Sequence, residues 1–130
     1  MDIDGLAAGS ELDWLVLHHA LDWKLGFPAL GQAAYTRPGP AGGRVESPAL
    51  PPVSSAIGEA WALVEHVQAL GLAFSLTFDP TVPGWEARIR RDRPPTGSVA
   101  ASAPTAPLAI ARATLKAVQA SIVVKGFKLD

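Results

Sequence analysis

A segment dense in glycine and proline divides this chain of 130 residues into two unequal parts. Residues 26–53 hold 11 glycines or prolines among 28 positions. Such a density opposes both helix and strand, so we predict a long loop or disordered insert here, with residues 37–43 as its least ordered stretch. The remaining positions must build the helices and strands of one domain, because a chain of this length supports a single core.

The composition narrows the class of protein. Hydrophobic residues make up 48% of the chain and charged residues 18%, and the formal net charge is −1. This near-neutral balance argues against a dedicated nucleic-acid binder. Cysteine is absent, which excludes disulfides, zinc ribbons, iron–sulfur clusters and thiol nucleophiles. The acidic N-terminal stretch and the lack of an apolar run of about 20 residues predict no signal peptide and no membrane span, and therefore a cytoplasmic protein.

The first helix should begin at Ser10, which can cap it, and end between Ala20 and Asp22. Its apolar residues cover much of its circumference, so contacts on more than one side are expected. Residues 23–25 have the character of a short extended piece.

The second helix should follow Ser54 and Ser55, either of which can cap it, and Gly71 should end it. Its spacing predicts one buried face. The residues of that face are Ile57, Ala60, Trp61, Val64, Val67 and Gln68.

Two alternating runs across a short turn predict a β-hairpin. Phe74, Leu76 and Phe78 share one face of the first run, and the second run, from Trp85, places Arg88 and Arg90 on the opposite face. Residues 79–84 between the runs are rich in turn formers. Residues 98–101 can add a third, weak strand.

A last helix should begin after Thr105, with a proline tolerated in its first turn. It is apolar on more than one face, and residues 121–124 can either continue it or form a strand. Because the first and last helices carry more apolar surface than one small sheet can cover, self-association is expected.

Four stretches, in this order, resemble the phage ABA sandwich domain family. They are LDWLVLHHALDWKL, VSSAIGEAWALVEHV, FSLTFDPTVPGWEARI and TAPLAIARATLKAVQ, and they cover roughly half of the chain. The resemblance implies an α+β domain, a small α/β/α (ABA) sandwich in which helices cover both faces of an antiparallel sheet of about three strands. It also implies a phage or prophage origin, hence the cytoplasm of the bacterial host, and it brings no catalytic residues.

The chain departs from that pattern at three places. Asp22 stands where glycine often precedes the tryptophan, His18 and His19 replace typical charged residues, and the glycine- and proline-rich insert is unusually long. These departures weaken the inference that this chain shares a ligand with that family.

Two features can bind an anion. Arg88 and Arg90 share a strand face, so their guanidinium groups could converge on a phosphate or carboxylate. The competing interpretation, a charged and solvated sheet edge, is the more common case. The start of the second helix, at Ser54 and Ser55, offers backbone N–H groups and hydroxyls, as many nucleotide sites do. Tyr35, within the long loop, is the aromatic residue most free to contact a ligand.

The aromatic and histidine residues have simpler explanations. Trp61 and Trp85 are assigned to the core. His18 and His19 point about 100° apart on a helix and cannot chelate one metal ion as a pair, so no metal site and no cofactor are expected.

No catalytic motif is present, because the chain has no phosphate-binding loop, nucleophile elbow or His-Glu-x-x-His sequence. Asp79 and Glu86 could form a carboxylate pair, but an aspartate before proline is an ordinary turn residue. The first hypothesis is therefore a non-catalytic phage accessory protein that sequesters a small anionic, nucleotide-type signal of host defence. The second is a protein-interaction or structural module, with a host protein as a possible partner. Weak nucleic-acid binding through residues 88–93 ranks third.

Overall fold

The computed structural model describes residues 2–25, 35–39, 42–47, 49–94 and 96–122. Within these ranges the chain forms three α-helices, one short 3-10 helix and two antiparallel three-stranded sheets. The elements are η1 (Ile3–Gly5), α1 (Ser10–Leu21), β1 (Lys24–Leu25), β2 (Tyr35–Pro38), β3 (Arg44–Ser47), α2 (Ile57–Ala69), β4 (Ala73–Asp79), β5 (Gly84–Arg91), β6 (Gly97–Ala103) and α3 (Ala106–Gln119). The predicted α+β class is confirmed. None of the described helices is long and apolar enough to cross a membrane.

The larger sheet is the predicted hairpin with a third strand, in the order β4–β5–β6. Phe78 lies opposite Trp85 and Leu76 opposite Ala87, so the apolar residues of the two runs share one face as expected. β6 pairs with β5 over its whole length from Gly97 to Ala103, and is longer than the predicted weak strand.

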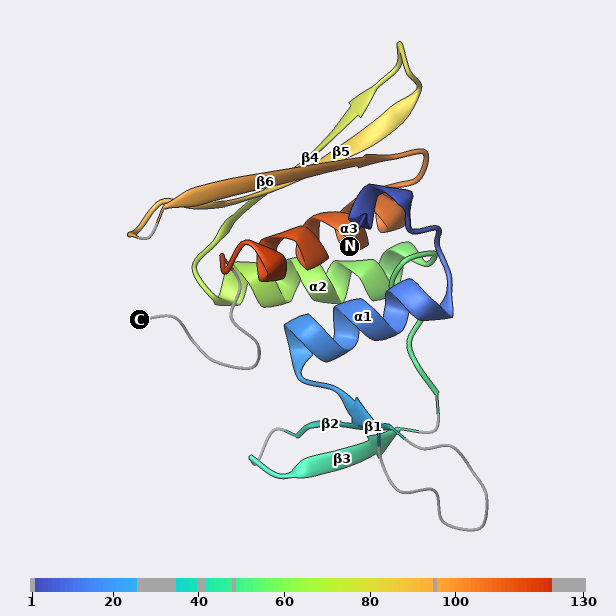
Figure 1. The fold of residues 1–130 in the computed structure, drawn as a ribbon, viewed down its shortest axis with the longest axis vertical. Helices are drawn as coiled ribbons and strands as arrows, with labels where there is room; N and C mark the ends of the chain where they lie inside the picture. Colours follow the sequence, from blue (N-terminus) through green and yellow to red (C-terminus); the bar gives the residue numbers. More distant parts are fainter. Residues whose placement is uncertain (1, 26–34, 40–41, 48, 95, 123–130) are drawn as a thin grey trace.

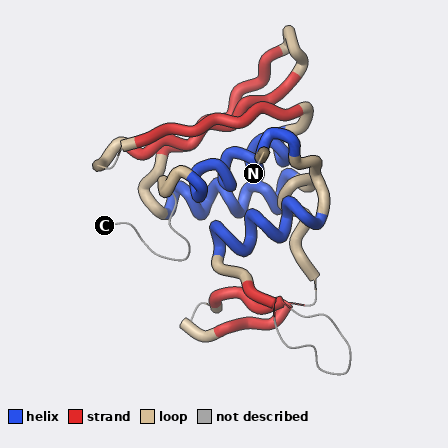
Figure 2. The backbone as a smooth tube through the Cα atoms, viewed as in Figure 1, coloured by secondary structure: helices blue, strands red, loops and turns tan. Residues whose placement is uncertain are grey.

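The layers run from the larger sheet, through the helices, to a small sheet formed by β1, β2 and β3 (Figure 1). Figure 2 shows the two groups of strands with all three helices between them. The described helices gather on one face of β4–β6. The opposite face carries hydroxyl and charged side chains that are exposed, among them Thr77, Glu86, Arg88 and Ser102. In this respect the layer order differs from helices on both faces of one sheet.

α3 is the central helix of the core. It packs on β5 and β6 on one side and on α1 and α2 on the other. Nine of its residues are buried, including Leu108, Ile110 and Leu115. The apolar surface that suggested self-association through the last helix is therefore covered within the chain itself.

The buried face of α2 is shifted from the predicted one: Ala60, Val64 and Val67 are buried as predicted, but Ile57 and Gln68 are exposed and Leu63 is buried instead. Trp61 is 45% exposed, so its assignment to the core is wrong. Trp85 is half-buried and packs against the core, as Trp14 does.

Both serine caps are corrected. α1 begins at Ser10 but its N-cap is Gly9, and α2 begins only at Ile57 with Ala56 as its N-cap. Neither helix, nor α3 behind Thr105, has a side-chain cap hydrogen bond. The predicted helix stop at Gly71 is confirmed. Gly71 directly follows the C-cap residue Leu70 and has a φ of +82°, the left-handed conformation with which glycine commonly ends helices.

The prediction of an unbroken loop over residues 26–53 is wrong, because β2 and β3 lie inside it. Arg37 and Pro38 belong to β2, and the N–H of Gly39 donates to the carbonyl of Gly43 at 2.7 Å to close the turn. Proline is tolerated at a strand end, where its missing N–H breaks no ladder bond. Residues 26–34, 40–41 and 48 lie outside the described part, as do 123–124 at the far end; α3 stops at Gln119.

Candidate functional site

The structure does not bring the five predicted ligand-binding residues together. Arg88 and Arg90 lie on the exposed face of β5, and Tyr35 lies in β2 of the small sheet, beyond the layer of helices (Figure 1). Ser54 and Ser55 lie in the turn before α2. A single anion pocket built from all five residues is therefore not formed.

Ser54 has a structural role. It is fully buried, and both its backbone N–H (2.8 Å) and its hydroxyl (2.6 Å) donate to Oδ1 of Asp13. The same hydroxyl accepts a hydrogen bond from the N–H of Gly9 at 2.9 Å. These bonds join the start of α1 to the segment that leads into α2, and they occupy the groups that were expected to bind a ligand. Ser55 is exposed beside it.

Arg88 and Arg90 are each paired with a nearby carboxylate. Arg88 Nη2 lies 3.2 Å from Glu86 Oε1, and Arg90 Nε lies 2.7 Å from Asp92 Oδ1. The hydrogen bond and charge of Asp92 raise the pKa of Arg90. All four side chains are largely exposed. The side chains are charged and solvated, as in the competing interpretation, but β5 is the central strand of the sheet, so the predicted sheet edge is wrong. Glu86 is engaged with Arg88 rather than in a carboxylate pair with Asp79.

Asp79 acts as a turn residue. Its Oδ1 accepts hydrogen bonds from the N–H (2.9 Å) and hydroxyl (2.6 Å) of Thr81, and these bonds lower the pKa of the exposed carboxyl.

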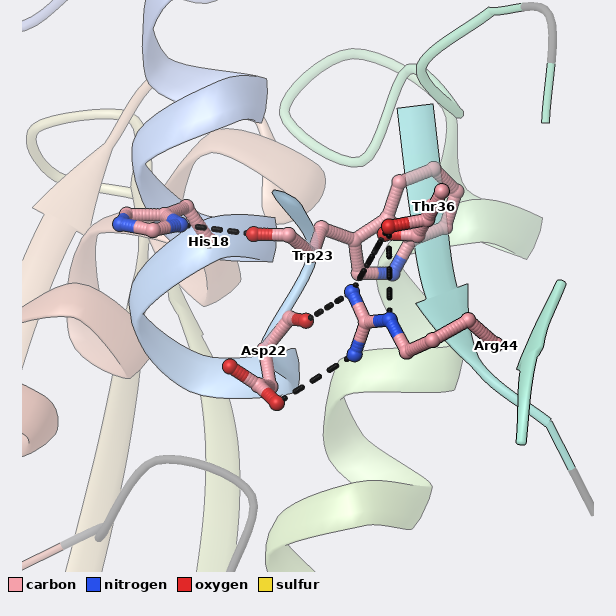
Figure 3. Close-up of polar contacts among 5 residues, drawn as sticks. All are labelled: His18, Asp22, Trp23, Thr36 and Arg44. Atoms are coloured by element: carbon pink, nitrogen blue, oxygen red, sulfur yellow. Dashed lines mark hydrogen bonds and ion pairs between the residues drawn. The ribbon is translucent and has the colours of Figure 1, made fainter. Parts of the chain in front are cut away.

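Tyr35 packs against the protein. Its ring lies 5.7 Å from that of Trp14 on α1, and Trp14 in turn stacks on His18 at 5.0 Å. His18 Nδ1 lies 2.6 Å from the carbonyl oxygen of Trp23 (Figure 3). The aromatic residue expected to be free for a ligand is thus half-buried at the junction of α1 with the small sheet.

Arg44 completes that junction. Figure 3 shows its guanidinium group between Asp22 and Thr36. Nη2 donates to the carbonyl oxygens of both residues at 2.9 Å, and Nη1 lies 3.4 Å from Asp22 Oδ2. Asp22 adopts a left-handed conformation with φ of 59°, which turns its carbonyl toward the arginine at the end of α1. The sequence did not indicate this role for Arg44, because Asp22 lies 22 positions earlier and Thr36 lies on a strand that was not predicted.

Among the described residues, no three histidine, aspartate or glutamate side chains are placed to hold a metal ion. His66 is the most unusual of the histidines: burial lowers its pKa against a smaller opposing effect from the backbone of Ala20, and its Nε2 is buried without a hydrogen-bond partner in the described part of the chain.

The strongest candidate for a binding site is an exposed apolar surface along β4, which we call the β4 edge surface. Its exposed side chains are Ile57, Trp61 and Phe78, and the half-buried Phe74 and Leu76, which also pack against the core, lie between them. The rings of Trp61 and Phe74 meet edge to face at 6.2 Å, which joins α2 to the strand. Ile57 (51%), Trp61 and Phe78 (46%) rank among the most exposed large apolar side chains. Soluble proteins seldom leave such side chains contiguous without a use.

Within the described residues, the same strand is an unpaired edge of the sheet. β4 pairs with β5 on one side only, and no described strand pairs with its other side. Its seven residues hold no proline or lysine, and Asp79 at the end is their one charge. Natural edge strands normally carry such protective residues. Their absence was the available sequence signal for this site, once the strand order is known.

β6, at the opposite edge, is protected by α3. Lys116 Nζ donates to the carbonyl oxygen of Ala100 at 3.0 Å, and Arg112 Nη1 donates to that of Ser102 at 3.0 Å. These carbonyls therefore point away from β5. The two edges of the sheet thus differ: α3 covers one, and the other lies beside exposed apolar side chains.

The backbone groups that β4 presents at its open edge follow from these bonds. Because Ala100 points away from β5, its neighbour Arg88 must bond to β4, at Ser75. Ser75 then points toward β5, and the alternation of the strand directs the N–H and C=O groups of Phe74, Leu76 and Phe78 outward. The residues with apolar side chains on this surface are thus also those with outward hydrogen-bonding groups.

No protein-family model, curated protein or solved structure matches this chain. The resemblance to the phage ABA sandwich domain family therefore stays a prediction from the four sequence stretches.

Proposed function

We propose that this protein is an interaction module that binds another protein chain through the β4 edge surface. The observation that carries the proposal is that the outward backbone groups of β4, unpaired by any described strand, belong to the residues with apolar side chains: the exposed Phe78 and the half-buried Phe74 and Leu76. A strand added at such an edge gains main-chain hydrogen bonds, while its alternate side chains contact the apolar face. Trp61 and Ile57 extend that face onto α2.

A photo-crosslinking amino acid placed at position 61 tests this proposal in cells. We expect covalent adducts with a protein chain from position 61. We expect none from the control position Ser98, which lies in β6, at the edge of the larger sheet opposite to β4, and is exposed on the face that the helices do not cover. Adducts from neither position, or equal adducts from both, would contradict the proposal.

A small-anion function is the second candidate. Ser75, Arg88 and Arg90 line a small hollow on the exposed face of the sheet, together with Ala73 and Phe74. An anion there would have to compete with Glu86 and Asp92 for the two guanidinium groups. Calorimetric titration with mono-, di- and cyclic nucleotides tests this candidate, and binding that persists after Arg88→Ala and Arg90→Ala would contradict it.

The wider setting is a proposal from the sequence resemblance. In it, the protein acts as a phage accessory module in the cytoplasm of a bacterial host, self-associates, and meets either a host protein or a nucleotide-type defence signal. Expression from an infected or lysogenic host, followed by native mass spectrometry, would report the subunit number and any retained small molecule.

A further inference from the structure

We propose that the chain that binds the β4 edge surface is a second copy of this protein, joined through an antiparallel β4–β4 pair into one continuous six-stranded sheet. This inference rests on the proposed function and names its partner.

The register of such a pair is restricted by the strand itself. Its two copies can match apolar face to apolar face only if residues of the same parity lie opposite each other. Centring the pair on Leu76 uses the whole strand, so that Ala73 lies opposite Asp79 of the second copy. In this register Phe74 lies opposite Phe78 of the second copy and Leu76 lies opposite its own equivalent.

In this register every outward N–H and C=O group of the three apolar β4 residues has a partner in the second copy. Phe74, Leu76 and Phe78 are the residues whose N–H and C=O groups face the open edge, and each meets one of the same set. Such directly opposed residues exchange both of their N–H···O bonds. The aromatic pairs formed on the apolar face add cross-strand contacts of the kind that stabilise sheets.

The exposed face of the sheet is also complementary in charge. Ser75 would lie opposite Thr77 of the second copy, so no like charges meet directly. Arg90 neighbours Ala73 in the sheet, and Ala73 lies opposite Asp79 of the second copy. The Cα atoms of Arg90 and that aspartate are then roughly 10 Å apart across a small side chain, within reach of an arginine and a carboxylate. Arg90 would be shared between Asp92 of its own chain and this aspartate, whose Oδ1 also accepts from Thr81. The two-fold axis repeats this pair at the other end of the interface.

The opposite edge explains why assembly stops at two copies. Lys116 and Arg112 occupy outward carbonyls of β6, so that edge is not equally available to a further copy. A sheet with one open edge closes on itself by two-fold pairing, and no open edge is left to recruit another chain.

The test uses the full chain and two proline variants that remove equivalent outward N–H groups. Leu76→Pro removes the donor at the centre of the predicted pair. Ser98→Pro is the matched control, because Ser98 has the same parity as Ala100 and so directs its N–H away from β5 on the protected edge. Proline is tolerated in an edge strand when its missing N–H faces outward, and circular dichroism checks that both variants fold.

Sedimentation equilibrium should give a dimer for the unaltered chain and for Ser98→Pro, and a monomer for Leu76→Pro. Because the chain has no cysteine, Leu76→Cys supplies a second and independent measurement. Opposed residues in such a pair have Cα atoms about 5.5 Å apart, within the range that a disulfide spans. Mild oxidation should link Leu76→Cys into a covalent dimer and leave Ser98→Cys monomeric on a denaturing gel.

A monomeric unaltered chain at every concentration, or a covalent dimer from Ser98→Cys instead of Leu76→Cys, would overturn the homodimer. If position 61 still crosslinks in cells while the purified chain is monomeric, the interaction module stands and only the identity of its partner is wrong.

Discussion

Ser54 and Asp13 form a buried polar pair across 41 positions of sequence, in which one carboxylate oxygen accepts from both the N–H and the hydroxyl of the serine. The exposed fraction of Asp13 is 6% and that of Ser54 is zero. A carboxylate this buried requires hydrogen-bond partners, because an unpaired charge away from water is costly. The pair therefore fixes how the segment before α2 lies on the first turn of α1.

Replacing Ser54 with alanine should destabilise the fold. The change removes a hydroxyl donor from Asp13 and the acceptor of the Gly9 N–H, and leaves the carboxylate under-satisfied in the core. We expect the free energy of unfolding to fall by about 1–3 kcal/mol, measured by urea denaturation. Ser55→Ala, one position along and exposed, is the control and should leave the free energy of unfolding nearly unchanged. Equal stability of the two variants would contradict this role of Ser54.

Arg44 should hold the small sheet against α1. Arg44→Lys keeps the positive charge but loses the planar group that reaches the carbonyls of Asp22 and Thr36 together. We expect faster amide hydrogen exchange over residues 35–38 and 44–47, with exchange in β4–β6 unchanged, since the described hydrogen-bond partners of Arg44 are Asp22 and Thr36, outside the larger sheet. Arg37→Lys, on the exposed side of β2, serves as the control and should not accelerate exchange.

The larger sheet could be predicted from the sequence because its signals are local. Alternation from Phe74 to Phe78, a turn and a second alternating run are contained in one short stretch, and the structure pairs the two runs as the predicted hairpin. The face of α2 could not be chosen in this way. Leu63 and Trp61 are both apolar, and a stripe through either satisfies helical spacing with Ala60, Val64 and Val67. Only the position of α3 decides that Leu63 is buried.

The candidate site was missed for the same physical reason. An exposed strand edge is a property of strand order, and strand order depends on contacts far apart in sequence. Ser54 looked like a free cap because its partner, Asp13, lies 41 positions earlier in α1. Tyr35 looked free because its partner, Trp14, also lies in α1, distant in sequence. Of the residues predicted to bind a ligand, Ser54, Tyr35, Arg88 and Arg90 have side-chain partners within the chain.

His66 should make stability depend on pH. Burial lowers its pKa in the folded chain below the ordinary 6.5, so the unfolded chain takes up a proton first as the pH falls. The free energy of unfolding should therefore be independent of this group above pH 6.5 and decrease below it, until the lower pKa of the folded state is reached. Denaturation curves at several pH values, compared with those of His66→Gln, measure the difference. A slope that is the same in both proteins would exclude His66 as its source.

The last prediction concerns the edge that α3 covers. Replacing both Arg112 and Lys116 with alanine removes the donors to the outward carbonyls of Ser102 and Ala100, so β6 becomes as open as β4. A sheet with two open edges can add copies at both, and such addition no longer closes after two chains. We therefore expect light scattering to detect assemblies larger than those of the unaltered chain, and their size should grow with concentration.

Lys116 also pairs with Asp4, and Arg112 also donates to the carbonyl of Leu6. Asp4→Ala is therefore the control, because it weakens the N-terminal contact but leaves both edge donors in place. If the double variant and the control assemble alike, the two cations have no protective role at β6. If only the double variant forms larger assemblies, and adding Leu76→Pro to it reduces their size, growth proceeds through both edges of the sheet.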